Sequence, residues 1–390
     1  MIMLSQQQRI FFEFLRFCIG TVQEAPSSLK GADWRVLYAM ARKQCLVGVL
    51  FDGIKRLPAD VGMDKGLLFQ WMAQNQTLRK ANARLDKAAV EVAEWFGRKG
   101  FRTCVLKGQG NALLYPPGME RTPGDIDLWV DGGDRKVVSF VRSLSPDEKV
   151  CYHHIGFPEY NGVEVEVHFR PSFLFCFRHN RRLQGYYERV MDGQFAHRVK
   201  LGEQGDVAVP KAEFNLIFQL THIFTHLMNE GIGLRQLLDY FFLLKNTDFI
   251  GNTDGDGFLL NSDFTDNTDR IGGNADGVDR RLLQDELRRL GLWEFAGAVM
   301  YIMKEIFGLE DNRLIVPPDV KRGRLVLKEA LEAGNFGQYD KRNWFGHSAL
   351  GHNLQRLYRD MRLVRYFPAE ALSEPFFRIW HFFWRKRIVR

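Results

Sequence analysis

The segment Gly124-Asp125-Ile126-Asp127-Leu128 carries most of the information about the fold, because two acidic residues flank one apolar residue at the start of a β-prone run. Residues i and i+2 of a strand point to the same face, so Asp125 and Asp127 are expected to lie a few ångströms apart. Two carboxylates that close repel each other unless a cation compensates their charge. Mg²⁺ prefers oxygen ligands, and paired ions assist phosphoryl transfer. The segment therefore predicts a divalent-metal site, although taken alone it is more typical of a surface turn.

Two further β-prone runs lie on either side of this segment. The first, Thr103–Leu106, ends at Lys107-Gly108-Gln109-Gly110, where we expect a helix to follow. The second, residues 163–168, alternates strictly between valine and polar residues. This alternation predicts a strand that buries its valines and presents Glu164, Glu166 and His168 on the other face. The acidic strand makes Glu166 a candidate third metal ligand and shifts the balance from a turn to a metal site.

Helical periodicity on both sides of these strands predicts an α+β protein, with a small mixed β-sheet flanked by helices and a largely helical C-terminal half. We expect an N-terminal helical segment over residues 1–100 and an α/β core over 101–210. A helical domain over 211–390 follows. It is interrupted at 251–279 by a Gly/Asn/Asp-rich stretch that we interpret as a mobile insert.

Composition restricts the class of protein. The chain has 390 residues, 45% of them hydrophobic, which is typical of a globular protein with two to three packed units. No apolar run approaches the ~18–20 residues of a spanning helix, and the start of the chain has no signal-peptide pattern, so we expect a cytoplasmic protein. Its five cysteines are scattered, which argues against a disulfide framework or a structural zinc site.

The net charge of +7 suits a phosphate-rich ligand, a nucleic acid or an anionic membrane face. The C-terminal segment 376–390 interleaves aromatic and basic residues. It is expected either to touch a membrane surface peripherally or to dock onto the helical domain, and so many aromatics favour docking.

The motifs together resemble the polymerase-β nucleotidyltransferase superfamily, in the order Val105-Leu106-Lys107-Gly108, Gly124-Asp125-Ile126-Asp127-Leu128 and Glu164-Val165-Glu166-Val167-His168. The chain is most similar to the uncharacterised bacterial nucleotidyltransferase family. Members of that family share a Leu-Lys-Gly segment, an Arg-x-x-Gly-Asp-Ile-Asp segment and a strand ending in His. The similarity begins near residue 35 and covers most of the chain.

This resemblance implies two Mg²⁺ ions, with Mn²⁺ as an alternative, and transfer of a nucleoside monophosphate from an NTP such as ATP. Asp125 and Asp127 would bridge both metals, and Glu166 would complete the catalytic site. Glu164 faces the same way, but Glu166 lies nearer the strand end that the family marks with His168.

The resemblance also implies a nucleotide-binding turn. Gly108 would lie against the triphosphate, and Gly124 would leave room for a phosphate. The superfamily usually has Gly-Ser or Gly-Gly in this turn, whereas Gln109 stands here and the phosphate-gripping hydroxyl is absent. We expect Lys107 or Arg121 to substitute as a charged donor. The competing interpretation of Lys107 is a solvated strand end.

Five further residues are candidates for the groove between the sheet and the helices: His168, His222, His226, Arg235 and Asp239. Each has a simpler explanation. The three histidines can be ordinary packed residues, and Arg235 and Asp239, four apart on a helix, can form an ion pair. The turn Gly334-Asn335-Phe336-Gly337 is expected either to shape the nucleotide pocket or simply to join two helices.

The sequence thus predicts a metal-dependent nucleotidyltransferase that moves an NMP to an unidentified acceptor and releases pyrophosphate. A sugar-linked acceptor is suggested by the resemblance alone. Two alternatives stay open. One is a catalytically inactive nucleotide-binding module of the same fold, which Gln109 favours. The other is a basic nucleic-acid-binding protein, which would bind oligonucleotides with a steep salt dependence.

Overall fold

The computed structural model describes residues 4–58, 62–250, 277–342 and 349–388. Its centre is a four-stranded sheet in the order β1-β2-β4-β3, in which β2 and β4 are parallel and the other neighbours are antiparallel. The strands are β1 (Thr103–Leu106), β2 (Ile126–Val130), β3 (His154–Tyr160) and β4 (Val163–His168). A hairpin, β5 (Arg198–Leu201) and β6 (Gly205–Ala208), and a short parallel pair, β7 (Phe249–Ile250) and β8 (Val278–Asp279), complete the strands of the described residues.

Helices make up most of the remaining structure. The N-terminal part contains α1 (Gln6–Cys18), α2 (Trp34–Lys43), α3 (Val47–Ile54) and α4 (Lys65–Arg98), with the 3-10 turn η1 (Ser27–Gly31). Between the strands lie α5 (Gly108–Ala112), α6 (Gly133–Leu144) and α7 (Phe177–Ala196). The C-terminal half contains α8 (Ala212–Asn229), α9 (Leu234–Asn246), α10 (Arg280–Arg289), α11 (Trp293–Glu305), η2 (Asp311–Arg313), α12 (Val320–Ala333), η3 (Asn335–Gly337), α13 (Ala349–Leu363) and α14 (Pro368–Ile388).

The predicted α+β fold class is confirmed, including the three strands expected from the sequence and the helical C-terminal half. The structure adds β3 and the β5–β6 hairpin, which the sequence patterns did not predict. Most of the insert predicted at 251–279 lies outside the described residues. Its last two residues, Val278 and Asp279, form β8 and pair with β7.

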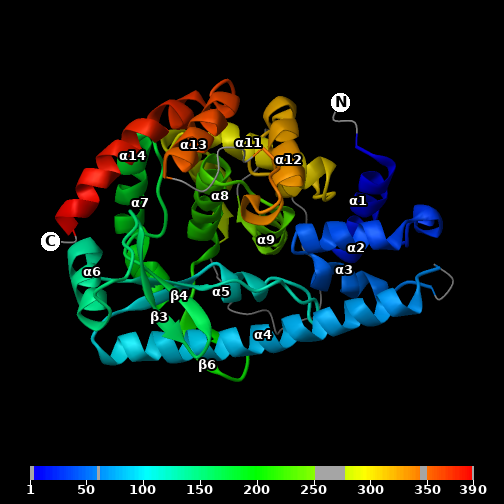
Figure 1. Ribbon diagram of the computed structural model, residues 1–390, viewed down its shortest axis with the longest axis horizontal. Helices are drawn as coiled ribbons and strands as arrows, with labels where there is room; N and C mark the ends of the chain where they lie inside the picture. The colour runs from blue at the N-terminus through cyan, green and yellow to red at the C-terminus, as the bar shows by residue number, and fades with distance from the viewer. Residues whose placement is uncertain (1–3, 59–61, 251–276, 343–348, 389–390) are drawn as a thin grey trace.

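The two faces of the sheet pack against different helices. In β2, Ile126, Leu128 and Val130 belong to the hydrophobic cluster that contains the C-terminal half of α4. The alternate residue Trp129 turns to the opposite face, where its ring lies 4.7 Å from that of Phe195 in α7. Figure 1 shows α4 running the length of the molecule below the sheet, with α7 and α8 above it. Strand alternation therefore sends Asp127 toward α8, and not toward α4.

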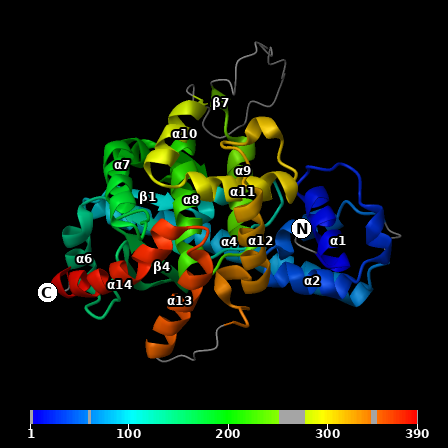
Figure 2. The same cartoon turned by 90° about the horizontal axis from the view of Figure 1, so that it is seen from above.

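The C-terminal helices close over this upper side. Figures 1 and 2 place α14 and α6 at one end of the molecule and α1 and α2 at the other. Glu370 of α14 holds the segment just before α7, because its Oε2 accepts hydrogen bonds from the backbone amides of Phe175 over 2.6 Å and Cys176 over 3.0 Å. Phe377 stacks on Phe173, with ring centroids 5.3 Å apart. Docking of the C-terminal aromatic segment is thus part of the fold.

None of the helices in the described residues combines the length and the apolar character that a membrane span requires.

Candidate active site

The register of the parallel strands brings two acidic residues together. Asp127 of β2 lies directly opposite Glu166 of β4, and Trp129 lies opposite His168. Side chains at paired positions project from the same face, so both carboxylates point toward α8. Glu164 is exposed and lies farther from the end of the strand. Of the two glutamates that the sequence left in competition, Glu166 is therefore the one placed beside Asp127.

Asp127 is buried, with 3% of its surface exposed, and is compensated by two basic groups. Its Oδ1 lies 2.7 Å from Lys107 Nζ and 2.8 Å from His168 Nε2. Burial alone would raise the pKa of Asp127, but Lys107 and His168 outweigh it and hold the pKa below its ordinary value. Burial alone would lower the pKa of His168, but its hydrogen bonds to Asp127 and Glu166 outweigh burial and raise the pKa to about 9. Asp127 is therefore a carboxylate at neutral pH.

Asp125 precedes β2 and shares this region with Asp127. The neighbouring charge of Asp127, followed by burial, raises the pKa of Asp125 to about 6. Two interacting carboxylates whose pKa values move apart are the electrostatic mark of a site that attracts a cation. Burial alone would raise the pKa of Glu166, but a hydrogen bond from His168 and the charge of His154 hold it below its usual value.

Lys107 is directed inward by the turn that follows β1. Its backbone has φ of 51°, in the left-handed region that non-glycine residues rarely adopt, and Gly108 follows with φ of 36°. The ammonium group lies between Asp127 and His222, whose Nε2 is 3.3 Å away. The competing interpretation of Lys107 as a solvated strand end does not hold, because Asp127 draws the side chain into the structure.

A cavity opens in front of the carboxylates, between the sheet and the helices α8 and α9. It contains six of the predicted nucleotide and metal ligands together with three of the predicted groove residues. It is lined by Lys107, Gly108, Asn111, Arg121, Gly124, Asp125, Asp127, Gln219, His222, Ile223, Arg235, Gln236, Asp239 and Phe336.

Two buried arginines in this cavity have different surroundings. Arg121 is fully engaged by Asp239, with Nε and Nη2 each 2.8 Å from one carboxylate oxygen. Arg235 donates from Nη1 to the backbone carbonyls of Thr122 and Pro123, each over 3.2 Å. Within the described residues it has no carboxylate partner at ion-pair distance. Asp239 therefore pairs with Arg121 across the fold and not with Arg235 along the helix, and Arg235 keeps the cationic charge available to the cavity.

Gln109 and His226 lie outside this cavity. The Gln109 side chain is buried and faces a separate hollow that also contains Asp86 and Glu120. His226 pairs with Glu230, the residue that follows the end of α8. The structure thus separates Gln109 from the carboxylates, although it follows Gly108 directly in sequence.

Sequence reasoning missed two histidines next to Glu166. His153 and His154 lie at the start of β3, and His154 Nδ1 is 3.3 Å from Glu166 Oε2. Burial lowers the pKa of His154 to about 4 and that of His153 well below its ordinary value. The consecutive histidines were the only sequence signal, because β3 contains a glycine and a proline and has no clear alternation.

The donor atoms of this region fit a divalent cation. Asp127, Glu166 and His168 each offer one ligand atom, and these atoms all lie within 4.8 Å of one another. Carboxylate oxygens suit Mg²⁺ and Mn²⁺, and Asp125 adds a further oxygen at the same edge of the sheet. The residues present therefore fit the metal dependence that the motifs imply.

Comparison with protein families agrees with the motifs. The family model described as "Uncharacterised nucleotidyltransferase" matches residues 30–308. A solved structure described as an antigenic nucleotidyltransferase-like protein from Paracoccidioides brasiliensis is similar, with 16% identity and a TM-score of 0.28. That match covers 42% of this chain and 78% of the other. No curated protein matches the chain.

Proposed function

Because the chain belongs to the family of uncharacterised nucleotidyltransferases, we propose that it transfers an NMP from an NTP to an acceptor in a divalent-metal-dependent reaction. One observation carries this proposal: Asp127 and Glu166 stand in register on neighbouring strands, beside Asp125 and in front of a cavity that holds a buried arginine. The acceptor oxygen would form a bond to the α-phosphorus. The bond between that phosphorus and the bridging oxygen would break, and pyrophosphate would leave with the electron pair.

Six residues of the cavity, together with Glu166, would each have a part in this reaction. Asp125, Asp127 and Glu166 would hold Mg²⁺ or Mn²⁺, which when bound supplies positive charge to the phosphate oxygens. Arg235 and Lys107 would hold the triphosphate, because both are cationic and line the cavity. Gly108 and Gly124 would let the phosphates approach the backbone. The proton of the acceptor would pass to a carboxylate of this set.

A nucleotide-binding module without turnover is the second candidate, and one observation favours it. Lys107 and His168 already compensate the charge of Asp127. A protein in which such internal ion pairs replace the metal would keep the nucleotide-binding cavity but would not catalyse NMP transfer.

The experiment that separates these functions uses NTPs labelled at the α-phosphate. The full chain is incubated with Mg²⁺ or Mn²⁺ and with sugar phosphates, RNA ends or protein as acceptors, and transfer and self-modification are both measured. Asp127→Asn should reduce transfer about 100-fold or more. The matched control Asp285→Asn removes an exposed acid of α10 and should leave transfer unchanged. If no label is transferred and Asp127→Asn binds nucleotide as well as the wild type, the enzyme proposal is refuted in favour of the binding module.

A further inference from the structure

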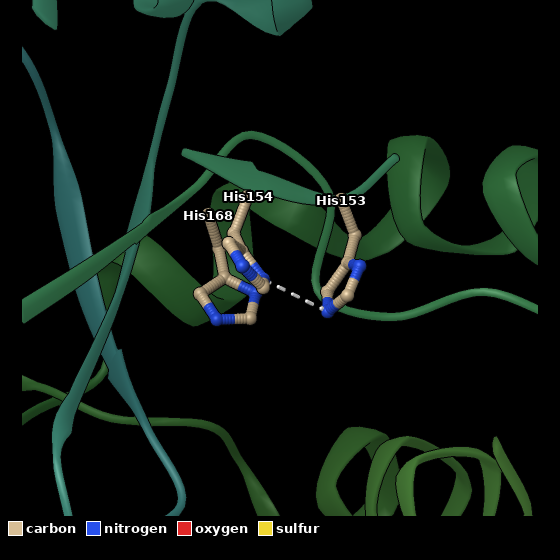
Figure 3. Close-up of side chains that lie close together, drawn as sticks. All are labelled: His153, His154 and His168. Carbon is tan, nitrogen blue, oxygen red and sulfur yellow. Dashed lines mark hydrogen bonds between the residues drawn. The ribbon is translucent and has the colours of Figure 1, made fainter. Parts of the chain in front are cut away.

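Three histidines converge beside Glu166, at the β3 edge of the sheet. His153 and His154 lie at the start of β3, and His168 ends β4 directly opposite His154 in the antiparallel register. The ring centroids are 4.4 Å apart for His153 and His154, 5.2 Å for His153 and His168, and 5.3 Å for His154 and His168. Figure 3 shows the rings turned toward one another.

The spacing of the donor atoms matches the coordination shell of a small transition-metal ion. His153 Nε2 and His154 Nδ1 are 3.1 Å apart, and His154 Nδ1 and Glu166 Oε2 are 3.3 Å apart. His168 Nε2 lies 3.5 Å from the same glutamate oxygen. Tetrahedral Zn²⁺ with bonds of ~2.0–2.1 Å keeps neighbouring donors about 3.3–3.4 Å apart. These three pairs of donors are therefore already spaced as they would be around such an ion.

The surroundings orient the rings for this purpose. His168 Nδ1 is 3.3 Å from the backbone carbonyl of Arg170, and donation to that oxygen would fix the ring once Nε2, which donates to Asp127 in this structure, releases its proton to bind an ion. A histidine that binds a metal commonly donates its other nitrogen to such a carbonyl. The Nδ1 atom of His153 is buried and has no hydrogen-bond partner among the described residues. Contacts within the protein thus leave the hydrogen bonding of this cluster incomplete.

We propose that His153, His154 and His168, together with Glu166, form a binding site for a borderline transition-metal ion of the Zn²⁺ class. Imidazole nitrogens suit such ions, whereas Mg²⁺ requires oxygen ligands. This inference depends on the proposed function at one point only. Glu166 belongs both to the histidine site and to the three carboxylates that would hold Mg²⁺. An ion at the histidines would hold this side chain next to Asp127.

A second group of donors in the described residues, Cys176, His179 and Glu370, has a different explanation. Glu370 Oε2 accepts two backbone amides at the start of α7, and its Oε1 lies 3.1 Å from His179 Nδ1. The carboxylate is therefore already occupied by these hydrogen bonds. This group serves as a competing outcome in the test.

The test is titration of the metal-free full-length protein with Co²⁺, which reports its ligands through visible absorption. We expect about one equivalent to bind with the intense bands of four- or five-coordinate cobalt, and Zn²⁺ to displace it. The double variant His153→Ala/His154→Ala should weaken binding at least about 10-fold. The matched control is His197→Gln, because His197 lies at the β5–β6 hairpin, where its ring contacts the carbonyl of Val209. This variant should bind cobalt as the wild type does. Circular dichroism checks that each variant is folded.

Two results would overturn the inference. One is a cobalt spectrum that the double variant leaves unchanged. The other is a thiolate charge-transfer band, which would place the ion at Cys176. Failure of the proposed function looks different, because Asp125→Asn should abolish transfer while cobalt still binds at the histidines. Transfer with Mg²⁺ by a protein that binds no cobalt would refute the histidine site and leave the enzyme proposal intact.

Discussion

Replacing Asp239 by asparagine is expected to destabilise the protein strongly, because it leaves the buried guanidinium of Arg121 without a compensating charge. The two side chains are only 7% and 8% exposed, and two hydrogen bonds of 2.8 Å join them. The hydroxyl of Tyr115 donates to the same carboxylate over 2.7 Å. Little of either side chain is accessible to water that could replace the lost partner, so most of the penalty falls on the folded state.

The magnitude follows from this burial. Removing one partner of a buried ion pair costs about 3–5 kcal/mol, whereas an exposed pair contributes about 0–1 kcal/mol. Asparagine keeps one carbonyl oxygen, so one of the two charge-assisted hydrogen bonds can persist in weakened form. We therefore expect the free energy of unfolding to fall by about 3 kcal/mol or more, out of a typical total of about 5–15 kcal/mol.

The assay is urea unfolding followed by circular dichroism, with binding of an NTP measured in parallel. Asp285→Asn is the matched control, because Asp285 pairs with Arg288 at the surface, with 75% and 51% of the two side chains exposed. It should change stability by less than about 1 kcal/mol. The double variant Arg121→Met/Asp239→Leu should recover much of the loss, since an apolar pair of similar volume needs no charge compensation.

An Asp239→Asn protein as stable as the Asp285→Asn control would refute the argument that this pair is a buried structural contact. If such a protein also lost NTP binding, Asp239 would instead be a direct ligand of the nucleotide. A destabilised variant that still binds NTP at low temperature would establish the structural role.

Three further predictions concern the carboxylates, a buried acid and a turn. Glu166→Gln should reduce transfer about 100-fold, whereas Glu164→Gln should leave it unchanged; equal losses would contradict the placement of Glu166 beside Asp127. Burial, followed by the charge of Glu374, raises the pKa of Asp360 to about 8, so the folded state keeps a proton that the unfolded chain loses near pH 4. Stability should therefore fall from about pH 4 to 8, and the melting temperature of Asp360→Asn should fall less over that range; parallel curves would contradict this. Gly337 has φ of 70°, and a Cβ there would lie 1.9 Å from the backbone carbonyl oxygen of Glu230. Gly337→Ala should therefore lower the free energy of unfolding by at least about 2 kcal/mol, and an unchanged melting temperature would disprove the clash.

The sequence was sufficient to place Asp127 and Glu166 on strands with their faces defined, because strand periodicity is local. It could not supply the register that sets these two residues opposite each other, since that depends on how two distant strands pair. The pairing of Asp239 shows the same limit. Helical spacing suggested Arg235 as its partner, but the true partner, Arg121, is 118 residues away.

The histidine cluster could not be predicted from the sequence for a related reason. His153 and His154 come just after an irregular loop, and no periodicity indicates which face they occupy. Their approach to His168 results from the antiparallel pairing of β3 with β4. The two interpretations of Lys107 stayed open in the sequence because a lysine at a strand end is usually solvated, and only the buried Asp127 explains why it turns inward.

The contact of Glu370 with the segment before α7 also sets an order of events during synthesis. Glu370 follows Phe175 by 195 residues in the chain. A ribosome that adds about 5–20 residues per second therefore synthesises Phe175 roughly 10–40 s before Glu370. Throughout that interval the backbone amides of Phe175 and Cys176 lack Glu370 as a hydrogen-bond acceptor. Phe173 also lacks the ring of Phe377 that stacks on it. The nascent chain therefore exposes an aromatic, unsatisfied surface next to a sheet that is otherwise complete. Coexpressed chaperones that hold such surfaces should raise the yield of folded protein.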